Sequence, residues 1–295
     1  EWYDHIARRG GHAVSFVQHF YGTSYQEAME LLLGKELGKA YPAAQPKREE
    51  LAKPFALPPP HTDMRRVYAY LMKQRHISRE VVTHFARSGL LYEDAQHHNC
   101  VFVGRDASGE PRFASRRGTY DLNGPGFKRD VAGSDKRVAF RLPSRPELDW
   151  VLVFEAPIDL MSHASIAADF YGRDWMQDHR ISTGCLWNGA IDRYLESHPQ
   201  IKRLVFAVDN DYLARDKNGQ LRNWGQLTAA KWMKAYTEKG YACAVHVPHL
   251  NDFNTDLVEM RKGRSVEDLD RQRMAELETA FEQSAEEEPE QGMEV

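Results

Sequence analysis

The sequence predicts an α/β fold built around a mainly parallel sheet. After Pro143, short apolar segments typical of buried strands alternate with segments of helical spacing. Two of the apolar segments, "WVLVFE" and "RLVFAVDND", end in carboxylates. Strands that alternate with helices favour right-handed βαβ units, in which the strands lie parallel in one sheet. With 295 residues, the chain is long enough to bury a full core.

The N-terminal segment, residues 1–38, is predicted to be a small helical unit. Apolar residues at helical spacing predict a first helix. Ser24 and Glu27 form a capping box that predicts the start of a second helix, which Gly34 ends. Residues 39–61 contain six prolines among small and charged residues, so we expect an extended linker there.

The next segment, residues 62–145, is predicted to form an α+β subdomain. Helical spacing at its start indicates two helices, with Ser78 as the N-cap of the second. The stretch "NCVFVGRDASGEPRFASRRG" predicts a strand hairpin that turns between Asp106 and Gly109. The subdomain therefore precedes the α/β half of the chain.

Charge is unevenly distributed along the chain. Residues 265–295 hold 11 Asp and Glu against two Arg, a charge of −9, so residues 1–264 carry +5 of the total of −4. We expect residues 263–295 to form a short helix followed by a disordered acidic tail. The mildly basic remainder permits a nucleic-acid partner. No apolar run is long enough to cross a membrane, so we expect a cytoplasmic protein without a membrane partner.

Carboxylates follow the predicted strands at the points where these end. The set comprises Glu155, Asp159, Asp209 and Asp211, with Asp252 and Asp256 after the next strand. Ligands of open parallel sheets gather at the carboxyl ends of the strands, so we expect these side chains to share one site. Clustered carboxylates repel one another unless a cation neutralises them. Oxygen ligands select Mg²⁺, with Mn²⁺ as a substitute, and the site therefore predicts phosphoryl-transfer chemistry.

The spacing of these acids resembles a known family. Glu-x-x-x-Asp after one strand and Asp-x-Asp after another is similar to the Toprim domain shared by DnaG-type bacterial primases, topoisomerases and some nucleases. The resemblance implies a Rossmann-like parallel sheet with flanking helices over residues 146–262. It also implies that Glu155, Asp209 and Asp211 hold Mg²⁺, with Asp159 beside them as a catalytic residue. The family glycine that closely follows Asp-x-Asp is absent, and the nearest glycines are Gly219 and Gly225.

The resemblance extends upstream of the acidic motifs. Residues 62–145 are similar to the basic subdomain that precedes Toprim in primases, and closer still to an uncharacterised domain that precedes Toprim in proteins of plasmids and conjugative elements. On that match, Arg117, Lys128 and Lys136 bind a template strand or a nucleoside triphosphate. Residues 1–38 resemble the tail of a primase zinc-binding domain. No set of Cys and His accompanies that tail, so no zinc is expected in this chain.

The combined expectation is a Mg²⁺-dependent nucleotidyltransferase that makes primers on single-stranded DNA from nucleoside triphosphates. A mobile element is the expected setting, with a helicase or relaxase as partner. Two alternatives stay open, namely a Toprim-type nuclease that uses the same carboxylates and a non-catalytic DNA-binding accessory protein. The chain starts with Glu1 rather than Met, which leads us to expect a longer polypeptide upstream.

Overall fold

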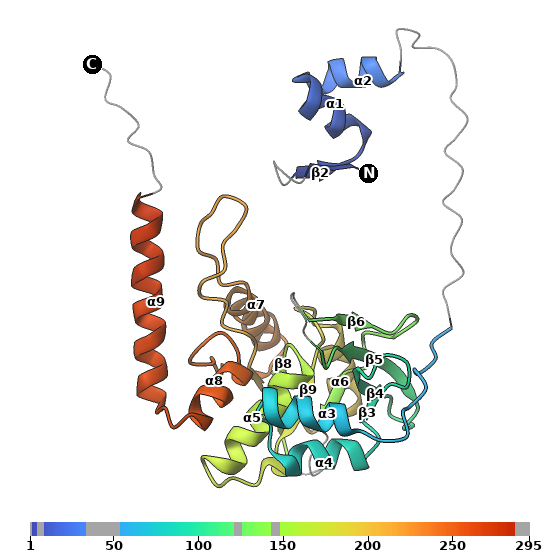
Figure 1. Ribbon diagram of the computed structural model, residues 1–295, viewed down its shortest axis with the longest axis vertical. Helices are drawn as coiled ribbons and strands as arrows, with labels where there is room; N and C mark the ends of the chain where they lie inside the picture. Colours follow the sequence, from blue (N-terminus) through green and yellow to red (C-terminus); the bar gives the residue numbers. More distant parts are fainter. Residues whose placement is uncertain (1, 5–8, 34–53, 121–125, 143–147, 287–295) are drawn as a thin grey trace. The chain divides into compact units, whose positions relative to one another are not determined.

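The computed structural model describes residues 2–4, 9–33, 54–120, 126–142 and 148–286 (Figure 1). The chain divides into two compact units, residues 1–52 and residues 53–295. Of the described helices, none is both long enough and apolar enough to cross a membrane.

The first unit is a small helical hairpin preceded by a strand pair. Its elements are β1 (Trp2–Asp4), β2 (Arg9–Gly11), α1 (Ala13–Tyr21) and α2 (Tyr25–Leu33). Helix α1 ends at Gly22, whose φ of 61° lies in the left-handed region that glycine adopts without strain. Ser24 N–H donates to Glu27 Oε2 at 2.7 Å, and Glu27 N–H donates to Ser24 Oγ at 3.3 Å. The predicted helix pair and its capping box are thus confirmed.

The second unit contains an antiparallel sheet of four strands in sequence order. They are β3 (Leu91–Glu93), β4 (Cys100–Arg105), β5 (Pro111–Arg117) and β6 (Lys128–Asp130). The predicted hairpin is confirmed as β4 and β5. Asp106 closes its turn, because its Oδ1 accepts from the N–H groups of Ser108 and Glu110.

Two predicted helices precede this sheet, and the first has an unexpected ending. Helix α3 (Arg65–Ala69) runs into a π-helical turn, η1 (Tyr70–Gln74), before α4 (Arg79–Arg87) begins. Ser78 occupies the N-cap position of α4, but its hydroxyl donates to the carboxylate of Asp169 instead of capping the helix. The N-cap prediction is therefore correct in position only.

A five-stranded sheet forms the centre of the second unit. Its order is β11 (Ala242–Val245), β10 (Arg203–Phe206), β8 (Trp150–Phe154), β9 (His179–Ser182) and β7 (Phe140–Leu142). All neighbours are parallel except β7, which is antiparallel to β9. The accompanying helices are α5 (Pro157–Asp169), η2 (Trp175–Gln177), α6 (Gly189–Ser197), α7 (Trp224–Glu238), α8 (Phe253–Arg261) and α9 (Val266–Glu286). The predicted α/β fold class is confirmed.

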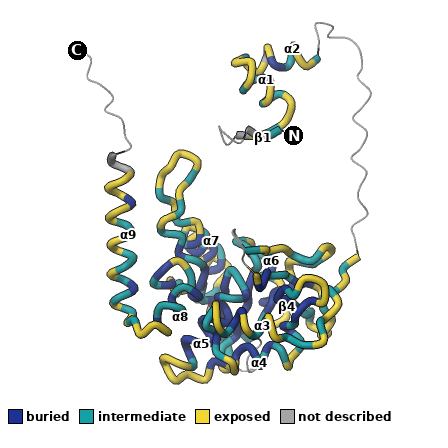
Figure 2. The backbone as a smooth tube through the Cα atoms, in the orientation of Figure 1, coloured by how far each residue is buried: buried dark blue, intermediate teal, exposed yellow. Residues whose placement is uncertain are grey.

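One apolar core cluster joins the predicted basic subdomain to the α/β sheet. Figure 2 marks the buried residues in dark blue. Phe85 and Phe102 both contact Phe140, at ring separations of 4.9 and 5.4 Å. Phe140 belongs to β7, which lies before the predicted boundary at residue 145 yet pairs with the parallel sheet. The boundary between residues 145 and 146 therefore does not separate two cores.

Two predicted connecting segments are ordered in part. Gly34, the predicted end of the second helix, and residues 39–53 of the predicted linker lie outside the described residues. Residues 54–61 pack along the antiparallel sheet, where Tyr92 donates to the Pro58 carbonyl at 2.7 Å. The helix predicted at the start of residues 263–295 is present as α9, which runs over residues 266–286 and into the predicted acidic run. Ser265 and Asp268 start it through a capping interaction. The remaining residues, 287–295, are outside the described part.

Candidate active site

The predicted acidic residues lie at the carboxyl edge of the parallel sheet. Strands β8 and β10 are direct neighbours, with Val153 opposite Phe206. Glu155 follows β8 immediately, and Asp209 follows β10 after two further buried residues. Because parallel neighbours end at the same edge, the two carboxylates emerge close together. The Gly184 N–H, just beyond β9, donates to the Glu155 carbonyl at 2.8 Å and holds this backbone in place.

The carboxylates raise one another's pKa values. Burial raises the pKa of Asp209 from 3.8 to about 8, and the negative charges of Glu155 and Asp252 add to the shift. Burial also raises the pKa of Asp159, which is 5% exposed, and the charges of Asp252 and Asp209 act in the same direction. The pKa of Glu155 is raised by burial and by Asp211. The edge of the sheet is thus a concentrated negative site.

The raised pKa of Asp209, caused first by burial and then by the neighbouring carboxylates, should make the stability of the chain depend on pH. The folded state holds a proton on Asp209 up to a pKa of about 8, whereas the unfolded chain releases it near 3.8. Between these values the folded state binds more protons, so raising the pH lowers the free energy of unfolding. We expect the unfolding temperature of the metal-free chain to fall across this window and the slope to flatten in Asp209→Asn. An equal slope in the variant would contradict this origin.

Asn254 connects Asp159 to the helices before the antiparallel sheet. Its backbone N–H donates to Asp159 Oδ1 at 3.2 Å, and its side-chain amide donates to the Arg75 carbonyl at 2.8 Å. The Arg75 guanidinium returns a hydrogen bond to Asn254 Oδ1 and donates through Nε to the Tyr70 hydroxyl at 2.9 Å. Arg117 donates to the same hydroxyl at 3.3 Å. Arg117 and Asp159 are therefore held in one polar network.

Two residues of this network lie at the ends of the π-helical turn η1, Tyr70 at its start and Arg75 at its C-cap. The extra residue in the turn is visible as the hydrogen bond from Arg75 N–H to the Tyr70 carbonyl, five residues back. The Arg75 guanidinium lies over the Tyr70 ring, 5.2 Å from the ring centroid. No sequence motif marks Tyr70, Arg75 or Asn254 as site residues, since each lies in or beside a segment of helical spacing.

A glycine from α7 completes the Asp-x-Asp motif. Gly225 N–H donates to Asp211 Oδ2 at 3.1 Å, and a Cβ at Gly225 would collide with the Asp209 carbonyl. The Gln226 side chain donates to that carbonyl at 3.0 Å. Gly225 lies 14 positions after Asp211 in the sequence, yet the fold brings it into contact with the motif. Only a residue without a side chain permits this approach.

The three predicted cations have different surroundings. Lys128 is close enough to Glu155 and Asp209 that its charge opposes the rise of both pKa values. Arg117 is the cross-strand neighbour of Lys128. Lys136 instead forms an ion pair with Asp130 at 2.9 Å. Lys128 is thus the predicted cation whose charge acts on Glu155 and Asp209.

The two acids after β11 also differ. Asp252 caps α8 by accepting from Thr255 N–H at 2.6 Å, and its charge acts on both Asp159 and Asp209. Asp256 accepts from the N–H groups of His249 and Leu250, both at 2.8 Å. Both oxygens of Asp256 thus hold the loop together. Asp252 is the better candidate for a contact with a bound cation.

The donor set fits a hard cation. Its groups are carboxylate oxygens, and Mg²⁺ is commonly held by one or two carboxylates with water completing the shell. Among the described residues, no three side chains of this acidic cluster offer ligand atoms within 4.8 Å of one another. The predicted metal ligands Glu155, Asp209 and Asp211 are therefore not assembled as a group of three in this structure.

Comparison with known proteins gives a partial family match and several similar folds. A family model described as a protein of unknown function, DUF3991, matches residues 69–145. No curated protein matches the chain. Among solved structures, the chain is similar to the primase fragment of the bacteriophage T7 primase-helicase protein, with 13% identity over 64% of this chain and 69% of that one and a TM-score of 0.43.

Two bacterial structures are also similar to the chain. The Aquifex aeolicus primase, covering its zinc-binding and RNA polymerase domains, has 16% identity over 90% of this chain and 71% of that one, with a TM-score of 0.43. The E. coli primase catalytic core has 16% identity over 75% of this chain and 76% of that one, with a TM-score of 0.44.

Proposed function

We propose that residues 53–295 form a Mg²⁺-dependent nucleotidyltransferase that synthesises primers on single-stranded DNA. The proposal rests on one observation above the others. The neighbouring parallel strands β8 and β10 bring Glu155 and Asp209 to one edge of the sheet, where burial and their mutual charge raise the pKa of Asp209 and the charge of Lys128 opposes the rise. A divalent cation stabilises such a cluster because it neutralises the repelling carboxylates. Phosphates are common co-ligands of Mg²⁺ in proteins.

The residues of the chain would divide the work between ion and substrate. Glu155, Asp209 and Asp211 would hold Mg²⁺, which supplies charge neutralisation at the triphosphate as the phosphoryl bond changes. Asp159 would add negative charge beside them. Gly225 fixes the backbone of the motif, so the carboxylates keep their positions when the substrate binds.

Substrate contacts are proposed for the basic strands and for an exposed aromatic residue. Lys128 and Arg117 lie opposite each other on β6 and β5, and would hold a triphosphate or a template phosphate. Trp224 is 44% exposed at the start of α7, next to Gly225, and the Arg222 guanidinium lies over its ring at 4.6 Å from the centroid, so a base would stack on the opposite face. Lys136 would have to leave its ion pair with Asp130 to take part.

The reaction we propose joins two nucleotides. The 3′-hydroxyl oxygen of one attacks the α-phosphorus of an incoming triphosphate, the bond from that phosphorus to the pyrophosphate breaks, and the hydroxyl proton passes to a water molecule. On the resemblance of residues 62–145 to a domain from plasmids and conjugative elements, primers for such an element are the proposed product. A helicase or relaxase is the proposed partner, because either one exposes single-stranded template.

The test is product formation by the full chain on single-stranded DNA with Mg²⁺ or Mn²⁺, with and without nucleoside triphosphates. Short oligonucleotides that appear only with triphosphates are the expected result. Cleavage of the DNA without triphosphates would replace the proposal with a nuclease. DNA binding without either product, and unaffected by Asp209→Asn, would replace it with an accessory role.

A further inference from the structure

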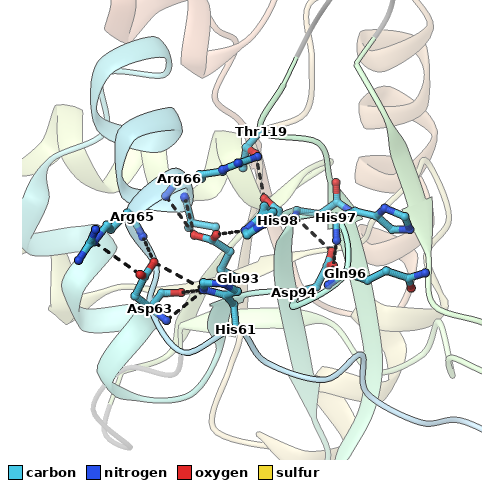
Figure 3. Close-up of polar contacts among 12 residues, drawn as sticks. His61, Asp63, Arg65, Arg66, Glu93, Asp94, Gln96, His97, His98 and Thr119 are labelled. Carbon is cyan, nitrogen blue, oxygen red and sulfur yellow. Dashed lines mark hydrogen bonds and ion pairs between the residues drawn. The ribbon is translucent and has the colours of Figure 1, made fainter.

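A second group of metal-ligand side chains lies apart from the acidic edge. His61, Glu93 and His98 offer ligand atoms that all lie within 4.8 Å of one another (Figure 3). They come from three segments: the extended stretch before α3, the end of β3 and the turn before β4. In the part of the chain that the structure describes, this is the only such group of three.

Glu93 is buried at the centre of the group, with 1% of its surface exposed. Its Oε2 accepts from the N–H groups of Arg66 and Val67 in the first turn of α3, at 3.0 and 3.2 Å. Its Oε1 lies 2.6 Å from His98 Nδ1. One oxygen therefore caps a helix, and the other is directed at the histidine (Figure 3).

The turn that carries His98 is held in an uncommon conformation. His98 has a φ of 57°, in the left-handed region that non-glycine residues rarely adopt. Asp94 fixes the turn by accepting from the N–H groups of His97 and Asn99, and Thr119 donates to the His98 carbonyl at 2.8 Å. Backbone strain of this kind often marks a functional site, and here it turns the His98 ring toward Glu93.

His61 is held against the same two residues. Its N–H donates to the Glu93 carbonyl at 2.7 Å, and its ring lies 4.7 Å from the His98 ring. The Asp63 N–H lies 3.2 Å from His61 Nδ1, and the Asp63 carboxylate lies 3.6 Å from it. Both histidine side chains remain partly exposed, at 28% and 27%, so an ion can reach them from solvent.

We propose that His61, Glu93 and His98 form a site for a zinc-class transition-metal ion with one open position. Two histidines and one glutamate are a ligand set that Zn²⁺ takes in proteins, and imidazole favours transition metals over Mg²⁺. Ligand atoms of a tetrahedral zinc ion lie about 3.4 Å apart. Binding would therefore widen the 2.6 Å contact between His98 Nδ1 and Glu93 Oε1 and adjust the other separations, which are all within 4.8 Å. The ion replaces the proton between His98 Nδ1 and Glu93 Oε1.

The consequence of binding is local. The ion ties the extended segment at His61 to the start of α3 and to the β3–β4 turn, which are otherwise joined by hydrogen bonds. This site departs from the expectation that the chain takes no zinc. His61 and Glu93 are 32 positions apart in the sequence, so the spacing of the ligands does not indicate a metal site.

The test is a titration of the full chain with Zn²⁺ in the presence of excess Mg²⁺, which occupies the acidic edge. We expect one equivalent to bind and to raise the unfolding temperature, and Co²⁺ to give the visible absorption of a low-symmetry site. His61→Ala and Glu93→Gln should each weaken Zn²⁺ binding by at least about tenfold. Glu93→Gln retains an oxygen that can cap α3, so it separates metal binding from folding.

His97→Ala is the matched control, because His97 is exposed in the same turn and lies outside the group. It should bind Zn²⁺ as the wild type does. Absence of stoichiometric binding by the wild type, or equal binding by wild type, His61→Ala and Glu93→Gln, would show that the group is a metal-free hydrogen-bond network and would overturn the proposal.

Discussion

Asp209→Asn is expected to lower the rate of primer synthesis by at least about 100-fold, beyond the 10–100-fold that residues supporting a metal ligand usually contribute. Asparagine keeps the shape of the side chain but removes the charge that a cation needs. The same change removes a buried carboxylate whose pKa is raised to about 8. The metal-free variant should therefore unfold at a higher temperature than the wild type at neutral pH.

This combination distinguishes a metal ligand from a structural residue. A structural acid would lose activity together with stability, whereas Asp209→Asn should lose activity while gaining stability. Asp216→Asn is the control from the same loop, because Asp216 Oδ1 only accepts turn hydrogen bonds from Asn218 and Gln220, which asparagine can also accept. Equal activity of wild type and Asp209→Asn would remove Asp209 from the site.

Gly225→Ala is expected to disrupt the Asp-x-Asp motif from a distance. In a helix, alanine is ordinarily about 1 kcal/mol more favourable than glycine. Here the new Cβ meets the Asp209 carbonyl, so α7 or the motif must shift. We expect a net destabilisation of about 1–3 kcal/mol, as for other overpacked positions. We also expect a loss of activity of about 100-fold, because displacement of a catalytic group by about 1 Å has such an effect.

The control for Gly225→Ala is Ala230→Gly, at an exposed position of the same helix. This change should lower stability by about 1 kcal/mol through helix propensity alone and leave activity intact. Chemical denaturation measures the stability of both variants, and the primer assay measures their activity. Full activity of Gly225→Ala would show that the close approach of α7 does not set the position of the motif.

The apolar core and a chain of hydrogen bonds connect the basic strands to the acidic edge of the parallel sheet. Phe140 in β7 packs against Phe85 and Phe102, and the hydrogen bonds from Arg117 through Tyr70 and Arg75 continue to Asn254. Buried apolar packing and polar bonds therefore connect the two sheets. The predicted template residues and the predicted metal ligands are parts of a single folded unit.

Local patterns in the sequence were sufficient for the elements that carry the acids. The strand before Glu155, the strand before Asp209 and the capping box at Ser24 and Glu27 were all predicted, because each depends on residues within a few positions of one another. The hairpin at Asp106 was predicted for the same reason. Strands β7 and β9 were missed, since neither is a continuous apolar run in the sequence and each acquires its role from the neighbour with which it pairs.

The sequence by itself determined the α/β class, the alternation of strands and helices after Pro143, and the acids that end two of the strands. Tertiary structure alone decided that β8 and β10 are neighbours, that Gly225 returns to Asp209, and that His61 meets Glu93. The physical reason is range. Helix periodicity, strand alternation and caps act over a few residues, whereas these meetings depend on packing between segments that are far apart along the chain.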